Sequence, residues 1–136
     1  MASQLNPYLN FNGTARDALE FYHSVLGGDL TITTFAEMGM SGPDAGRVMH
    51  GLLESEAGYT IMASDLTSDM EYHAPAGFSV SLSGSDGDAL RRYWEKLSSA
   101  GTVTMPMQKQ AWGDEFGMCV DQYGVPWMVN ISAPQM

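Results

Sequence analysis

The three histidines are the side chains of this sequence best suited to acid–base chemistry near neutral pH. His50 lies in an apolar, strand-like run, where a neutral imidazole could act as a general base or hydrogen-bond a ligand. Lone histidines on strands are more often structural or partly exposed, so both interpretations stay open. His23, on the polar side of a helix-like segment, is expected to be solvated, and His73 beside Pro75 has no indicated role.

Methionine is unusually abundant, with 11 in 136 residues. Four methionines fall in strand-like runs: Met49, Met62, Met118 and Met128. Thioethers fill irregular space and adapt to apolar ligands, so these strands could line a soft, promiscuous pocket. An ordinary core is an equally good interpretation. Trp112 stands just before a strand-like run, where its indole could stack on a planar ligand.

The remaining candidate groups have simpler interpretations. Cys119 is the one cysteine; it has no histidine near it in sequence and is expected to be buried, as is Trp127. Asp65, Asp69 and Glu71 gather in a polar connecting segment, but their spacing matches no calcium loop. We expect them to be solvated loop charges.

Composition limits the partners. Six basic and sixteen acidic side chains give a formal charge of −10, which disfavours nucleic acid. The apolar runs are too short to span a membrane. The N-terminus lacks the basic start and apolar run of a signal peptide, so a cytoplasmic location is expected. Hydrophobic content of 44% suits one globular domain, residues 1–136.

The elements that would position these side chains follow from hydrophobic periodicity. Apolar residues at three- and four-residue spacing predict a helix over 14–26, capped by Thr14 or Asn12 and ended by Gly27-Gly28. Strands are expected at 7–11, 30–35, 47–54 and 59–63, with a glycine-rich loop at 38–46 and a connector at 65–76. The second half is expected to contain strands at 78–82 and 102–107 and a helix at 86–97.

The order of elements repeats within the chain. A shift of 71 residues places Asp17-Ala18-Leu19 on Asp88-Ala89-Leu90, and later a shift of 66 places Met62 on Met128. Two tandem βαβββ modules, about 5–65 and 76–133, are therefore predicted: an α+β fold with a curled mixed sheet around a central trough. Ligand binding is expected in that trough.

Two blocks of sequence carry a family resemblance. Tyr8-Leu9-Asn10-Phe11-Asn12-Gly13 with Ala18-Leu19-Glu20-Phe21-Tyr22, and Asp121-Gln122-Tyr123-Gly124-Val125-Pro126-Trp127 near the end, resemble PhnB-like proteins of the vicinal-oxygen-chelate (glyoxalase/bleomycin-resistance/dioxygenase) superfamily. The resemblance implies the glyoxalase fold and a homodimer. Such proteins are also labelled demethylubiquinone-methyltransferase-like, but the sequence has no Rossmann-type glycine-rich turn to support that activity.

The resemblance also implies where a metal would be held. Metal-dependent relatives use one position on the first strand and one on the fourth strand of each unit. Spacing carries these, give or take one residue, to Pro7, Met62, Phe78 and Met128. Proline and phenylalanine have no donor atoms, and thioethers are weak ligands for hard divalent ions. We therefore predict no metal and no cofactor.

Two functions fit these observations. In the first, the trough holds an apolar or aromatic small molecule without a metal; its expected ligand-binding residues are Tyr8, Asn10, His50, Met62, Ser81, Trp112, Met118 and Met128. In the second, the chain is a glyoxalase-like lyase, isomerase or dioxygenase acting on a small oxygenated substrate, with His50 as the candidate catalytic base or a metal bound elsewhere. The acidic charge disfavours an anionic ligand unless Arg47 or Lys109 reaches the pocket.

Overall fold

A computed structural model describes residues 3–133 of the chain. The chain divides into two compact units, residues 1–73 (unit 1) and 74–136 (unit 2), and each is described by itself. In the part of the chain described, no helix is long and apolar enough to cross a membrane.

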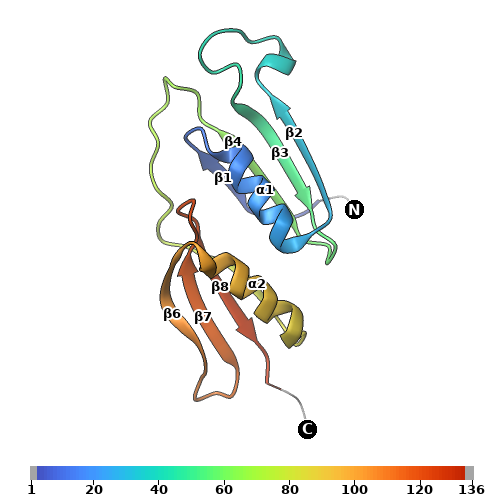
Figure 1. Ribbon diagram of the computed structural model, residues 1–136, viewed down its shortest axis with the longest axis vertical. Coiled ribbons are helices and arrows are strands. Elements are labelled where there is room, and N and C mark those ends of the chain that lie inside the picture. Colours follow the sequence, from blue (N-terminus) through green and yellow to red (C-terminus); the bar gives the residue numbers. More distant parts are fainter. Residues whose placement is uncertain (1–2, 134–136) are drawn as a thin grey trace. The chain divides into compact units, whose positions relative to one another are not determined.

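Unit 1 is a four-stranded sheet with one α-helix (Figure 1). Its elements in chain order are β1 (Tyr8–Phe11), α1 (Ala15–Leu26), β2 (Asp29–Thr34), the short 3-10 helix η1 (Ala36–Met38), β3 (Val48–Glu54) and β4 (Thr60–Asp65). The strand order is β1-β4-β3-β2. β1 runs parallel to β4, and the other neighbours are antiparallel.

Unit 2 repeats this plan. Its elements are β5 (Val80–Gly84), α2 (Gly87–Ser99), β6 (Thr102–Lys109), β7 (Glu115–Val120) and β8 (Pro126–Ile131). The strand order is β5-β8-β7-β6, again with one parallel pair, β5 and β8. Both units therefore have the order βαβββ, which confirms the predicted α+β fold and its internal repeat. That the two modules form a single domain stays a prediction.

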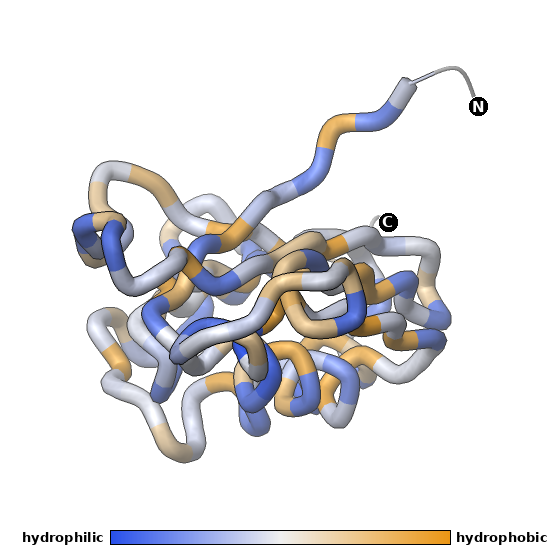
Figure 2. The backbone as a smooth tube through the Cα atoms, turned by 90° about the horizontal axis from the view of Figure 1, so that it is seen from above, coloured by the Kyte–Doolittle hydropathy of each residue, from blue (hydrophilic) through white to orange (hydrophobic). Residues whose placement is uncertain are grey.

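Each helix covers one face of its own sheet. Buried and half-buried residues alternate along β4 and β8, as strands with one buried face require. Hydrophobic and hydrophilic stretches are interspersed along the backbone (Figure 2). The helix of each unit packs so closely on its sheet that one strand position under it must be a glycine, which has no side chain. A Cβ on Gly51 would lie 2.2 Å from Leu19 Cδ1, and one on Gly117 would lie 2.9 Å from Trp94 Cη2.

The strand register corrects the predicted repeat. The shift of 66 holds for the last two strands, because Gly51 pairs with Ala63 and Gly117 with Val129. The first strands, however, place Leu9 beside Ala63 and Leu82 beside Val129, which is a separation of 73 residues rather than 71. The shift of 71 therefore aligns the helix sequences of the two units. The first strands, which bear candidate ligand residues, match at a shift that is two residues larger.

Several predicted boundaries also move. β5 starts at Val80, so Phe78 precedes the strand, and it runs through Ser83 and Gly84, beyond the predicted end at residue 82. β4 extends to Asp65. The helix over Ala15–Leu26 does end at Gly27 and Gly28, with φ of 71° and 94°. The expected cap is wrong: Thr14 occupies the N-cap position without a side-chain hydrogen bond.

Candidate functional site

The face of the unit 1 sheet that α1 does not cover is the first candidate site. On β1, Leu9 and Phe11 are buried while Tyr8 and Asn10 are exposed, so the latter two point away from the helix. Met62 lies directly beside Tyr8, and Ser64 lies beside Asn10, where its hydroxyl donates to Asn10 Oδ1 at 3.1 Å. Predicted ligand residues from β1 and β4 therefore share one open face.

His50 brings β3 into the same group. Its neighbour Gly51 packs under Leu19 of the helix, so His50 and Leu52 lie on the open face. Tyr8 Oη lies 3.4 Å from His50 Nδ1, and the two ring centroids are 5.9 Å apart. These residues are 42 positions apart in the chain, and their side chains meet across the intervening strand β4. Of the ligand candidates, this pair is the one with acid–base character.

The open face of unit 2 holds the matching set. Ser81 lies beside Met128, and Met128 lies opposite Met118. Phe116 lies opposite Asn130 on the same strand pair. The exposed Trp112 packs edge-on against Phe116, with ring centroids 6.4 Å apart. Ser81, Met118 and Met128 thus share a face, with the Trp112 ring at its edge.

Strand register changes the first-strand positions that the family resemblance implied for a metal ion. Tyr8 and not Pro7 is the partner of Met62, and Ser81 and not Phe78 is the partner of Met128. A phenol, an alcohol and two thioethers do not form the imidazole and carboxylate set that zinc, nickel, manganese or iron prefer. Within residues 3–133, no group of three or more His, Cys, Asp or Glu side chains lies close enough together to hold a metal ion. The donor set at these positions does not fit such an ion.

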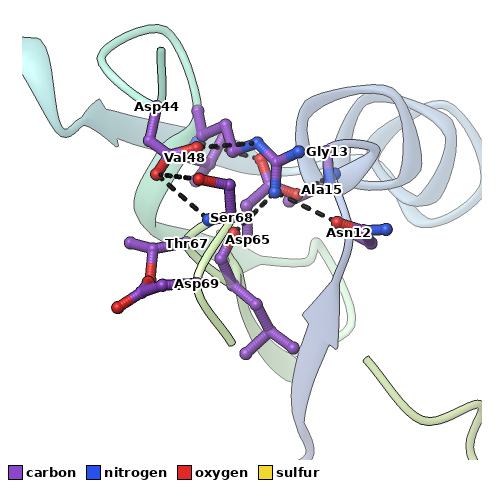
Figure 3. A network of polar contacts seen from close by, with 11 residues as sticks. Asn12, Gly13, Ala15, Asp44, Val48, Asp65, Thr67, Ser68 and Asp69 are labelled. Atoms are coloured by element: carbon purple, nitrogen blue, oxygen red, sulfur yellow. Dashed lines mark hydrogen bonds and ion pairs between the residues drawn. The ribbon is translucent and has the colours of Figure 1, made fainter. Parts of the chain in front are cut away.

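The sequence predicts that Asp65 is a solvated loop charge, but it is buried at the end of β4. It is 5% exposed, and its carboxylate accepts hydrogen bonds from the backbone N–H groups of Gly13 at 2.8 Å and of Ala15 and Val48 at 3.0 Å each (Figure 3). This carboxylate from β4 therefore takes the place of a local cap for α1, and it fixes the turn that follows β1.

Arg47, the basic side chain next to Asp65, is held in a network of polar contacts. Arg47 donates to Leu66 O at 2.7 Å and to Asn12 Oδ1 at 3.1 Å, and it lies 3.5 Å from Asp44 Oδ1. The backbone N–H and hydroxyl of Ser68 both donate to Asp44 Oδ2 at 3.0 Å (Figure 3). The backbone hydrogen bond from Ser68, with help from Arg47, holds the Asp44 pKa below its ordinary value. Arg47 is thus a structural residue.

His23 is also structural, contrary to its prediction as a solvated side chain. It is half-buried, and its Nε2 lies 2.8 Å from the carbonyl oxygen of Gly28, just beyond the end of α1. A Cβ on Gly28 would lie 2.0 Å from Glu54 O, so this turn is pressed against the β3 end. The imidazole ties that turn to the helix.

Unit 2 has a buried carboxylate at a different place, Asp121 in the turn between β7 and β8, which is 4% exposed. It accepts hydrogen bonds from the N–H groups of Tyr123 and Val125 and from Trp127 Nε1, at 2.8, 3.0 and 2.8 Å. Trp127 and Cys119 are both buried, as predicted. Burial, with the nearby Asp121 charge, raises the pKa of the Cys119 thiol to about 11, which keeps this thiol protonated at neutral pH.

A separate open hollow of about 700 Å³ lies at the N-terminus of α2. Its charged lining comprises Asp86, Asp88, Arg91, Lys109 and Glu115, and it includes none of the predicted ligand residues. Arg91 already pairs with Glu115 and with Asp88. Asp86 caps the helix by accepting from the Ala89 N–H at 3.3 Å. Most of the charged groups that line the hollow are thus paired with one another or with the helix backbone. The open sheet faces are therefore the better candidate site.

Sequence relatives cover almost the whole chain. Protein YjdN of Escherichia coli is 31% identical over 96% of this chain and 97% of its own length. Protein PA1353 of Pseudomonas aeruginosa is 34% identical in sequence; its crystal structure covers 98% of this chain and 100% of that one, with a TM-score of 0.88.

More distant solved structures show the same fold. A putative 3-demethylubiquinone-9 3-methyltransferase, the PhnB protein from Bacillus cereus, has a TM-score of 0.73 at 23% identity, covering 96% of this chain and 100% of that one. A glyoxylase/bleomycin resistance protein/dioxygenase domain from Frankia has a TM-score of 0.62 at 13% identity, covering 100% and 96%.

The family model described as 3-demethylubiquinone-9 3-methyltransferase matches residues 3–130. This match spans both βαβββ units and all eight predicted ligand residues. The chain belongs to this PhnB-like family, which has the glyoxalase/bleomycin-resistance fold.

Proposed function

We propose that this chain binds a small apolar or aromatic molecule on the open faces of its sheets and does so without a metal ion. The observation that carries the proposal is the pairing of Tyr8 with Met62 and of Ser81 with Met128. At these positions each unit has a neutral hydroxyl beside a polarizable thioether, which suits an uncharged ligand better than a divalent cation. That the two faces enclose one trough, and that the protein is a cytoplasmic homodimer, stay predictions.

Binding is tested with N-phenyl-1-naphthylamine, a neutral apolar dye that fluoresces in apolar surroundings. We expect saturable binding and a rise in melting temperature, because a ligand selective for the folded state stabilises it by RT ln(1 + [L]/Kd), about 2.7 kcal/mol at 100 times Kd. Met62→Lys should weaken binding at least tenfold by placing a charge on the open face. The matched control is Met38→Lys at the exposed end of η1, which should bind as the wild type does. Equal binding by both variants would refute the site.

The same titrations distinguish the metal-free protein from a metalloprotein. After chelator treatment, calorimetric titration with Zn²⁺, Ni²⁺ or Mn²⁺ should give no tight stoichiometric binding. One tight equivalent per chain, or stabilisation by small molecules only when a metal is present, would contradict the proposal.

The contact between Tyr8 and His50 favours a second candidate function, a glyoxalase-like enzyme acting on a small oxygenated substrate. A phenol next to an imidazole can hold and move a proton without a metal. Exchange of the α-hydrogen of hydroxyacetone for deuterium, followed by NMR, tests this. Catalysed exchange that His50→Gln abolishes would support the enzyme. An exchange rate equal to that in buffer without protein would leave ligand binding as the only supported function.

A further inference from the structure

Among the described residues of unit 1, no arginine or lysine is available on the open face. The two basic side chains of unit 1 are Arg16, on the helix that covers the opposite face, and Arg47, which is occupied by Asp44, Leu66 and Asn12. Asp29 and Glu54 lie opposite each other at one end of the same sheet. An anionic ligand on this face would meet carboxylates and no arginine or lysine of the unit, so unit 1 selects against it.

The middle of this face combines apolar contact with neutral hydrogen-bonding groups. Met62 lies between Tyr8 and Leu52 across three neighbouring strands. Threonines continue the face on β2, where Thr31 is paired with Leu52 and Thr33 with His50. A flat apolar body can rest on Met62 and Leu52 while its polar atom reaches the hydroxyls and the imidazole beside them.

The Tyr8–His50 pair can present either a donor or an acceptor. When Tyr8 donates to Nδ1, the imidazole carries its proton on Nε2 and can donate to a carbonyl. When Nδ1 carries the proton and donates to Tyr8, the phenol can donate outward and Nε2 accepts from a hydroxyl. In the described part of the chain, Nε2 of His50 has no other hydrogen-bond partner.

We infer that unit 1 recognises a neutral, oxygen-bearing planar molecule, such as a phenol or a conjugated ketone, through hydrogen bonds from the Tyr8–His50 pair. The inference rests on the proposed binding function and makes it more specific. The oxygen is held by the pair, and the apolar ring lies over Met62 and Leu52. A carboxylate in place of the hydroxyl would weaken binding.

Equilibrium dialysis with naphthalene, 2-naphthol and 2-naphthoate compares an apolar, a neutral hydroxylated and an anionic form of one ring system. We expect wild-type protein to bind 2-naphthol most tightly and 2-naphthoate least. Tyr8→Phe should lower the affinity for 2-naphthol by roughly two- to tenfold, the equivalent of one neutral hydrogen bond, and leave naphthalene unchanged. The matched control is Tyr59→Phe in the β3–β4 turn, which should behave as wild type.

A second variant tests whether the pair acts as a unit. His50→Leu should also lower 2-naphthol affinity, and the double variant should lose no more than the larger single loss, because either change removes the same arrangement. Tightest binding of 2-naphthoate, or an unchanged preference for 2-naphthol over naphthalene in Tyr8→Phe, overturns the inference while binding itself stands. Failure of all three compounds to bind would overturn the proposed function as well.

Discussion

Replacing Asp65 by Asn is the most direct test of how unit 1 positions its first strand. The carboxylate is buried and accepts three backbone N–H groups, two on Oδ1 from Gly13 and Ala15 and one on Oδ2 from Val48. An amide has one acceptor oxygen, so its best orientation keeps the first two bonds and turns an NH₂ group toward the Val48 N–H. One donor then becomes unsatisfied, and two charge-assisted bonds become neutral.

The expected cost is about 3 kcal/mol. A buried hydrogen bond to a charged group contributes roughly 1.5–3 kcal/mol, and the two remaining bonds are weakened by loss of the charge. With an m-value of about 1.5 kcal/mol/M, the urea midpoint should fall by about 2 M. Asp69→Asn is the matched control, because Asp69 is exposed and accepts only from the Thr67 hydroxyl; its effect should stay within about 0.5 kcal/mol.

Amide hydrogen exchange provides a local readout for the same variant. The N–H groups of Gly13, Ala15 and Val48 should exchange slowly in the wild type and faster in Asp65→Asn, with Val48 affected most. If Asp65→Asn unfolds at the same urea concentration as Asp69→Asn and these three amides stay protected, the buried carboxylate does not hold the turn and the reasoning is refuted.

Three further outcomes are expected. Iodoacetamide at pH 7.5 should label Cys119 only after unfolding, because the thiol is 1% exposed and burial raises its pKa to about 11; rapid labelling of the native protein would contradict this. The pKa values of Asp44 and Asp114 are lowered, chiefly by hydrogen bonds from Ser68 and Asn130, so their stabilisation is complete above the ordinary value of 3.8 and disappears as pH falls through the lower folded values. Thermal melts should therefore separate the wild type from Asp44→Asn and Asp114→Asn at pH 6, with the difference vanishing near pH 2. Gly28→Ala should destabilise by several kcal/mol, since its Cβ would lie 2.0 Å from a backbone carbonyl at a φ of +94°; a melting temperature within 2 °C of wild type, a margin of about 0.5 kcal/mol, would exclude the clash.

The helices and the general repeat could be predicted from sequence because their signal is local. Leu19, Tyr22 and Leu26 recur at helical spacing, and all three are buried. Gly27 and Gly28 adopt the positive φ that ends the helix. These features depend on neighbours within a few residues, so composition and periodicity contain the information needed to find them.

The buried carboxylates could not be identified in this way. Asp65 has its partners 17 to 52 residues away, and in sequence it resembles the polar connector that follows it. The two-residue error in the repeat has a similar cause. Identities such as Tyr22 with Tyr93 align the helices, but only backbone pairing shows that Ser81 corresponds to Tyr8.

The match between Tyr8 and Ser81 favours a site without a metal ion. Had only one unit lost its ligands, the other would be expected to retain a histidine or carboxylate that could still bind an ion. Instead, the first strand of each unit supplies a hydroxyl, from Tyr8 or Ser81, and the fourth strand supplies a thioether, from Met62 or Met128. Two residues further along each strand, Asn10 lies beside Ser64 and Ser83 beside Asn130, and these side chains are neutral as well. Because both units carry the same uncharged chemistry, each is suited to a neutral organic molecule rather than to an ion, and the Tyr8–His50 pair gives unit 1 the means to recognise the oxygen of such a molecule.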